Sequence, residues 1–239
     1  LRDHFRYEDY AILYRTNAQS RIFEEALRKR NLPYKIYGGL SFYQRKEIKD
    51  LLAYFRVIIN PNDNEALKRI INYPARGIGQ TTISKLEEVS LAANLPVMEV
   101  IRQLPGSNPA GLNKGTLSKI MEFINLIRSF EMLVDESSAY DAATVIAEKS
   151  GILKDLYNDR SPEGLSRHEN LQELLNAIQE FSISAREEGR PEKLGNFMEE
   201  VSLMTDQDNE KEEDRNRITL MTIHSAKGLE FKNVFVVGL

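Results

Sequence analysis

A polar loop near the carboxyl end of the chain carries the residue types best suited to chemistry. It contains an imidazole, a hydroxyl, an ammonium group, a glycine and a carboxylate, which are His224, Ser225, Lys227, Gly228 and Glu230. Ammonium and hydroxyl groups bind phosphate, a carboxylate accepts hydrogen bonds from sugar hydroxyls, and glycine lets another group approach the backbone closely. This mixture predicts a site for a phosphate, a sugar or both.

Two apolar runs flank the loop, at residues 218–223 and 234–237. Runs of this length are typical of buried strands, so we expect two core strands of an α/β sheet. Ligands of open α/β sheets bind in loops at the carboxyl ends of strands. An isolated Lys-Gly pair usually belongs to a solvated hairpin loop, and no glycine-rich run precedes Lys227, so this is not a Walker A motif.

The stretch IHSAKGLEF, residues 223–231, resembles motif V of the superfamily 1 DNA helicases of the UvrD, PcrA and Rep type. In that family the loop lies where the DNA strand and the nucleotide meet. The resemblance implies that His224, Ser225 and Lys227 contact DNA. It also implies that Gly228 and Glu230 contact ATP, with Glu230 toward the ribose.

A strand, a helix and a second strand are predicted at the amino end, at residues 10–14, 21–30 and 34–37. Three such elements within thirty residues form a βαβ unit, so the sheet is predicted to be parallel. The stretch LYRTNAQSR, residues 13–21, resembles motif IV of the same helicases. The resemblance implies that Tyr14 lies against adenine and that Arg15 is the catalytic arginine on the γ-phosphate.

Chemistry supports this assignment, because an aromatic face stacks on a base and an arginine fork binds phosphate oxygens. Such an arginine stabilises charge that develops during phosphoryl transfer. A Tyr-Arg pair alone is more often a packed ring beside an arginine at the sheet rim, and it is the surrounding motif that favours nucleotide. We expect both motifs to adjoin in one sheet.

Two further segments supply candidate DNA contacts. GGLSFYQRKEIKD, residues 38–50, resembles motif IVa, where Phe42, Tyr43, Arg45 and Lys46 are candidates to lie beside the DNA. Phe42 and Tyr43 are equally suited to pack the helix start. YPARGIG, residues 73–79, precedes a predicted helix whose free backbone amides suit phosphate. Arg76, Gly77 and Gly79 are therefore predicted DNA contacts, although a tight turn also needs glycine.

Linker composition divides the chain into domains. Residues 105–115 are rich in Pro, Gly, Asn and Ser, and residues 205–216 are polar and acidic, which predicts a mobile linker. We expect an α/β domain from residues 1–107 and 217–239, with an all-helical insertion at 108–216. By resemblance these are the RecA-like domain 2A of a P-loop NTPase and its inserted domain 2B.

Composition excludes several classes of protein. The absence of cysteine rules out disulfides and thiolate metal sites, and no His or carboxylate spacing predicts a metal. No apolar run approaches the roughly 20 residues of a membrane helix, so we expect a cytoplasmic protein without a membrane partner. Residues 1–86 carry a net charge of +7 and residues 87–239 carry −11, so contact with a polyanion is predicted to be local.

The resemblance extends over the whole chain and implies an ATP-dependent 3′-to-5′ DNA helicase that translocates on single-stranded DNA in repair or replication. Its implied partners are single-stranded and 3′-tailed duplex DNA and the N-terminal domains 1A and 1B. ATP and Mg²⁺ are the implied cofactors of the full-length protein. Because the phosphate cradle and the acidic pair for Mg²⁺ are absent here, this C-terminal-half fragment is not expected to hydrolyse ATP.

Two alternatives remain open. One is a RecB/AddA-type helicase–nuclease subunit, although the motif IV stretch resembles the UvrD type better. The other is a non-catalytic module, in which the helical block binds a partner and the sheet is scaffold. A nuclease domain in the missing C-terminal part would identify the first alternative. A Walker A loop upstream of Leu1 would favour a helicase over the second.

Overall fold

The computed structural model describes residues 6–209 and 216–238, which form two compact units. Among these residues the first unit contains 6–49, 159–176, 199–209 and 216–238. The second contains 50–158 and 177–198. The domain boundaries expected after residues 107 and 216 differ from this division and stay a prediction.

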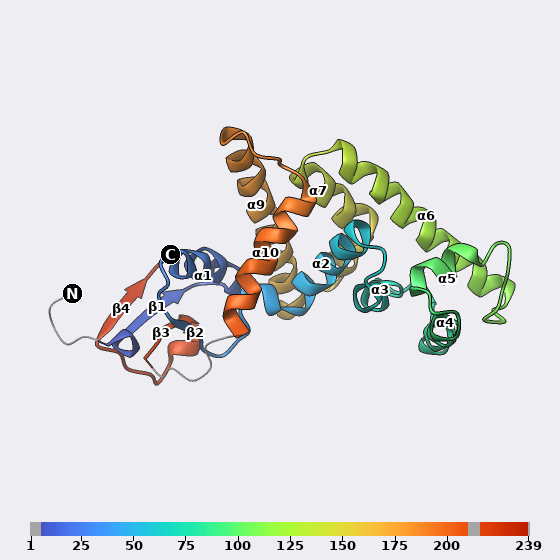
Figure 1. The fold of residues 1–239 in the computed structure, drawn as a ribbon. Coiled ribbons are helices and arrows are strands. Elements are labelled where there is room, and N and C mark those ends of the chain that lie inside the picture. The colour runs from blue at the N-terminus through green and yellow to red at the C-terminus, as the bar shows by residue number, and fades with distance from the viewer. Residues whose placement is uncertain (1–5, 210–215, 239) are drawn as a thin grey trace. The chain divides into compact units, whose positions relative to one another are not determined.

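A parallel four-stranded sheet forms the centre of the first unit (Figure 1). Strand β1 (Tyr10–Tyr14) lies between β3 (Ile218–Thr222) and β4 (Asn233–Val236), and β2 (Tyr34–Ile36) pairs with the other edge of β3. Every pair is parallel, which confirms the predicted α/β class. The run at residues 234–237 therefore joins the sheet that contains residues 11–13, as predicted.

Helix α1 (Ser20–Lys29) packs its apolar residues against one face of this sheet. Alternate residues of a strand point to the same face, so Ile12 and Tyr14 lie on the side that carries Leu220 of β3. Leu27 of α1 closes this cluster. The βαβ unit predicted from the sequence is present, but β3 separates its two strands.

Strand β4 differs from the core strand that was predicted. Val234, Phe235 and Val236 are 47%, 55% and 48% exposed, so the prediction of a buried strand is wrong for the described structure. Among the residues that the structure describes, β4 pairs only with β1, and its side chains lack the neighbours that bury β3. The Phe235 ring does stack on Tyr10, with ring centroids 6.5 Å apart.

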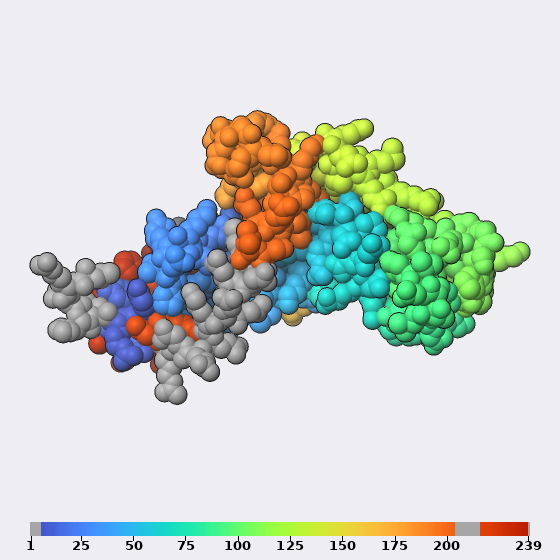
Figure 2. Space-filling model, in the orientation of Figure 1, coloured from blue at the N-terminus to red at the C-terminus, as the bar shows by residue number. Residues whose placement is uncertain are grey.

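The second unit is helical. It contains α3 (Asn64–Ile70), α4 (Gln80–Ala93), α5 (Val97–Gln103), α6 (Lys114–Glu136), α7 (Ala139–Lys149) and α8 (Ile152–Asn158). Three more helices contribute residues to both units, α2 (Lys46–Ile59), α9 (Pro162–Glu187) and α10 (Leu194–Asn209). In Figure 2, α4 and α5 pack closely against each other.

The two predicted linkers have different outcomes. Residues 104–113 are irregular, as their composition indicates, yet Ala110 and Leu112 are buried within the second unit. In the run 205–216, helix α10 continues to Asn209, so the prediction of a linker is wrong for residues 205–209. Extending an existing helix costs little, because nucleation has already occurred. Residues 210–215 lie outside the described residues.

Truncating Leu220 to alanine should test whether this sheet face is the core of the first unit. Leu220 is fully buried, so Leu220→Ala is expected to lower the free energy of unfolding by about 3 kcal/mol. Leu203→Ala, at a 68% exposed position of the same unit, should change it by less than about 0.5 kcal/mol. Urea denaturation measures both. Equal effects would contradict this assignment of the core.

Candidate functional site

The carboxyl ends of β1 and β3 bring two predicted motifs to one edge of the sheet. The Ile223 amide donates to the Tyr14 carbonyl oxygen at 2.9 Å, directly after β3 ends. A 3₁₀ helix then spans His224–Ala226. Arg15 follows β1 immediately, and its side chain is exposed. An arginine and a polar turn therefore share the edge where ligands of parallel sheets bind.

The His224 turn is held by short polar contacts. The Ser225 hydroxyl lies 2.8 Å from the Thr222 hydroxyl, and the Ser225 amide donates to the same Thr222 oxygen at 3.2 Å. Gly38, after β2, adopts φ +75°, and a Cβ there would come within 3.4 Å of the Ser225 hydroxyl. Ser225 is consequently half-buried, whereas His224 and Lys227 are exposed.

The segment after this turn leads away from the carboxyl edge. Gly228 adopts φ +87°, a conformation that favours glycine, and Glu230 is exposed. Lys232 pairs with Asp9 at 3.0 Å, and Asp9 directly precedes β1. Glu230 therefore lies in a crossover that runs from the carboxyl edge of β3 to the amino edge of the sheet.

Tyr14 lies in the core. Its side chain is 1% exposed and stacks on Phe23 with ring centroids 6.4 Å apart and planes 7° from parallel. Burial raises the pKa of the Tyr14 hydroxyl to about 12. The predicted contact with adenine requires an open ring face, so the core around Phe23 must open for that contact. The role stays a prediction.

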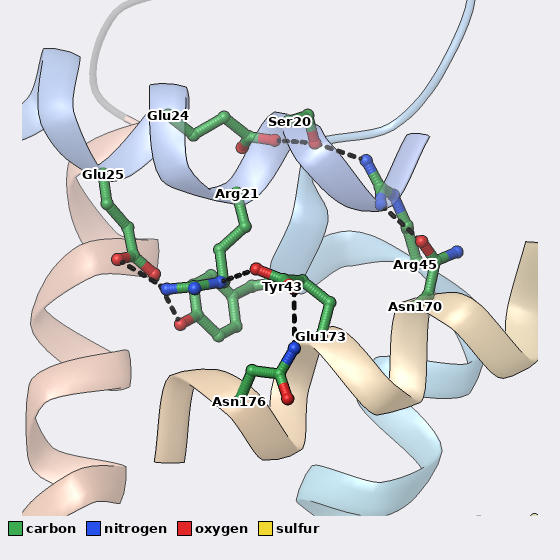
Figure 3. A network of polar contacts seen from close by, with 9 residues as sticks. All are labelled: Ser20, Arg21, Glu24, Glu25, Tyr43, Arg45, Asn170, Glu173 and Asn176. Carbon is green, nitrogen blue, oxygen red and sulfur yellow. Dashed lines mark hydrogen bonds and ion pairs between the residues drawn. The ribbon is translucent and has the colours of Figure 1, made fainter. Parts of the chain in front are cut away.

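A buried carboxylate joins α1 to the segment that follows β2 (Figure 3). Glu24 is fully buried and accepts hydrogen bonds from the Ser20 hydroxyl at 2.7 Å and from the Phe42 amide at 3.1 Å. Arg28 approaches the same carboxylate to 3.4 Å. Burial raises the pKa of Glu24, although these donors oppose the rise. A buried charge of this kind persists because several donors satisfy it.

Arg45 and Phe42, both predicted DNA contacts, lie within this cluster. The Arg45 guanidinium donates to the Asn170 side-chain oxygen at 2.8 Å and to the Ser20 hydroxyl at 2.7 Å. Phe42 is fully buried, and the Arg45 guanidinium lies 5.2 Å from the centre of its ring. The structure thus uses both side chains to pack the start of α2. For Phe42 this was the alternative weighed from the sequence, whereas the buried position of Arg45 was not expected.

Helix α9 contributes two polar side chains to this cluster. Asn170 also donates to Glu47 at 2.5 Å, and Glu173 accepts from the buried Arg21 at 2.7 Å. Arg21 reaches Glu25 at 3.1 Å as well. Figure 3 shows α9 supplying Asn170 and Glu173 opposite the residues of α1. Asn170 of α9 therefore holds the start of α2 through Arg45 and Glu47.

An open pocket of about 250 Å³ lies beside this cluster in the first unit. Its lining includes Asn17 after β1, Gly39 after β2, Lys46 of α2 and Ser166 and Arg167 of α9. Glu47 and Glu163 also line it, and Glu163 pairs with Arg167, so the lining carries charges of both signs. The charges largely cancel, which gives the pocket no strong preference for an anion.

In the second unit, Arg76 is held by hydrogen bonds to other residues of the chain. Its guanidinium donates to the carbonyl oxygens of Ile70 at 3.0 Å, Pro74 at 3.1 Å and Ser150 at 3.0 Å. It also donates to the Tyr54 hydroxyl at 2.6 Å. Arg76 therefore fixes the shape of the loop, and its predicted contact with DNA would have to compete with these bonds.

The two glycines beside Arg76 lie in an exposed turn. Gly77 adopts φ +70°, and Gly79 precedes the first turn of α4 without a side-chain cap. Lys119 of α6 reaches the Gly77 carbonyl oxygen at 3.5 Å. The sequence did not predict this contact, because 42 residues separate Lys119 from Gly77 and no spacing rule connects them.

Residues 6–209 and 216–238 lack two features that would bear on cofactors and membranes. Within that part of the chain, no group of three His, Asp or Glu side chains is arranged to hold a metal ion. The described helices also include none with the length and apolar character needed to cross a bilayer.

Known proteins of one family are similar to this chain over nearly its whole length. The family model for the UvrD-like helicase C-terminal domain matches residues 1–239. The ATP-dependent DNA helicase PcrA of Staphylococcus aureus (strain Mu50) is 39% identical over 237 residues. PcrA of Staphylococcus epidermidis (strain RP62A) is 40% identical over 240 residues. Each alignment covers 98% of this chain but only 31% of the relative, so the chain spans about a third of the length of these proteins.

Removing the Glu24 carboxylate should destabilise the first unit. Glu24→Ala leaves the Ser20 and Phe42 donors buried without this acceptor, so we expect the free energy of unfolding to fall by about 3 kcal/mol. Glu169→Ala, at an exposed position of the same unit, is the control and should have little effect. Urea denaturation monitored by circular dichroism provides the measurement.

The stability should also depend on pH through Glu24. Because burial raises its pKa, the folded state keeps this proton to a higher pH than the unfolded state does. The free energy of unfolding therefore falls as the pH rises above the ordinary glutamate value of 4.5. Glu24→Gln removes this titration, so it should gain stability relative to the wild type between pH 4.5 and neutrality. A difference independent of pH would contradict the assignment.

Proposed function

Because this chain belongs to the family of UvrD-like helicase C-terminal domains, we propose that it is part of the motor of an ATP-dependent DNA helicase. The whole protein would hydrolyse ATP and translocate along single-stranded DNA, unwinding duplex in the 3′-to-5′ direction. Its work would lie in repair or replication. The sheet of the first unit would face nucleotide and DNA, and residues 108–216 would correspond to domain 2B.

One observation carries this proposal, namely the position of β1 between β3 and β4. This pairing places the exposed Arg15 and the His224 turn at the same edge of the sheet, as the bond from Ile223 to Tyr14 requires. A group that binds phosphate and groups suited to a DNA strand are therefore mechanically connected through two adjacent strands. A change at the nucleotide can then move the residues that hold DNA.

The described residues are suited to form part of a nucleotide site. Arg15 is exposed at a strand end and can bind a phosphate oxygen, and Gly228 leaves backbone open to a ligand. Glu230 is exposed and available to a ribose hydroxyl. ATP supplies the phosphoryl group, and Mg²⁺ would be held by the N-terminal domains 1A and 1B of the same protein. The role of Arg15 is to stabilise negative charge on the γ-phosphate.

The DNA contacts would come from both units separately. In the first, His224 and Lys227 are exposed beside the anchored Ser225. In the second, Gly77, Gly79 and the nearby Lys119 present backbone amides and a cation, which bind phosphate without reading bases. Such contacts suit translocation, because a motor must hold any sequence.

Replacing Arg15 tests the catalytic part of the proposal. In the whole protein, Arg15→Ala should lower kcat for ATP by about 10³-fold, since an arginine on the γ-phosphate has effects of this size. Arg30→Ala, an exposed arginine at the end of α1, is the matched control and should leave kcat unchanged. Steady-state ATPase assays with single-stranded DNA measure both. Full turnover by Arg15→Ala would show that Arg15 does not stabilise the γ-phosphate during catalysis.

Replacing Lys227 tests the DNA contact. Lys227→Ala should weaken binding of single-stranded DNA to a similar extent for different sequences, and the slope of log K against log salt should fall by about 0.7. Lys29→Ala removes an exposed charge elsewhere in the first unit and serves as the control. Fluorescence anisotropy over a salt series gives both quantities. An unchanged slope would exclude a phosphate contact by Lys227.

A further inference from the structure

Gln19 makes an unusual set of contacts in the 3₁₀ helix Asn17–Gln19, which connects β1 to α1. Its side-chain oxygen accepts hydrogen bonds from the Arg15 amide at 2.9 Å and from the Thr16 amide at 3.0 Å. These are the first two amides after β1. A carboxamide oxygen has two lone pairs, so one side chain can satisfy both donors.

The other end of the same side chain reaches a distant segment. The Gln19 amide nitrogen donates to the Gly238 carbonyl oxygen at 3.2 Å, across 219 residues of sequence. Gly238 adopts φ +66°, and a Cβ at that position would collide with the Gln19 side chain. A residue with a side chain at position 238 would therefore displace Gln19.

These contacts connect the ends of two neighbouring strands. Next to them, the Val237 amide donates to the Leu13 carbonyl oxygen at 2.9 Å, so backbone and side-chain bonds together fix the segment after β4 beside the end of β1. The backbone that carries Arg15 is held from both directions, although the Arg15 side chain itself is exposed.

We infer that Gln19 is a positioning residue for Arg15, an inference that rests on the proposed function. Gln19 fixes the backbone from which the arginine extends, and so aims the guanidinium at the γ-phosphate. Preorganisation of this kind matters because a displacement of about 1 Å can lower a rate by about 10²-fold. A purely structural cap would instead change stability and leave the ATPase rate of folded protein intact.

Hydrogen exchange tests the contacts without nucleotide. In Gln19→Met, which keeps the length of the side chain but removes its polar atoms, the Arg15 and Thr16 amides should exchange at least about tenfold faster. The Ile223 amide, bonded to the Tyr14 carbonyl, should not change. Gln19→Glu retains the acceptor and should retain the protection, while Gln179→Met at an exposed position of α9 is the control. Unchanged exchange at Arg15 and Thr16 in Gln19→Met overturns the inference.

Kinetics of the whole protein tests the consequence. Gln19→Met should lower kcat by about 10- to 100-fold and change KM for ATP less than about threefold, with partial recovery in Gln19→Glu. In an Arg15→Ala background, Gln19→Met should add less than about twofold. Losses that multiply in the double variant overturn the inference. If Gln19→Met keeps the wild-type kcat while Arg15→Ala loses activity, the inference about Gln19 fails and the proposed function stands. If Arg15→Ala keeps full activity, the catalytic role proposed for Arg15 fails.

A substitution at Gly238 tests the hydrogen bond between Gln19 and Gly238 from the acceptor side. Gly238→Ala should also accelerate exchange at Arg15 and Thr16, because the new Cβ displaces Gln19. Gly189→Ala is matched to it, since Gly189 has the same φ of +66° and open space around its Cβ. If both glycine variants leave the two amides protected, Gln19 does not depend on Gly238 and the inference fails.

Discussion

Parallel pairing on both sides of β1 is the constraint on which the first unit depends. The strand is short, and its two neighbours come from a stretch about 200 residues later in the chain. Pairing with β3 aligns Tyr14 with Thr222, so the residues that follow each strand leave the sheet together. The pairing therefore sets which polar groups share the carboxyl edge, before any side chain makes a specific contact.

A polar cluster then holds the elements around this edge. The buried carboxylate of Glu24 and the guanidinium of Arg45 both bond to Ser20, and Asn170 of α9 completes the set. Such a cluster is costly to bury and stable only when every member is satisfied. It restricts α1, the start of α2 and the first half of α9 to one arrangement, and α1 begins five residues after Arg15. Rigidity near the arginine thus comes from buried side chains that bond to one another.

Much of this fold could be predicted from the sequence, because apolar periodicity reports strands and helices directly. The βαβ unit, the parallel sheet and the strands at both ends were predicted in this way. What sequence could not supply was the set of long-range partners. Arg45 is occupied by Asn170, 125 residues away, and Arg76 by Ser150, 74 residues away. Residue type alone could not show that Tyr14 and Phe42 are buried or that β4 is exposed.

The order of strands has a consequence for how the chain acquires its structure. Strands β1 and β2 are synthesised first, yet they do not pair with each other, because β3 lies between them. At about 5 to 20 residues per second, a ribosome needs about 10 to 40 s to reach β3. Throughout that interval β3 does not yet cover the apolar residues of β1 and α1. These residues are therefore exposed and can be bound by a chaperone. Helices of the second unit, built from local contacts, can form in the meantime.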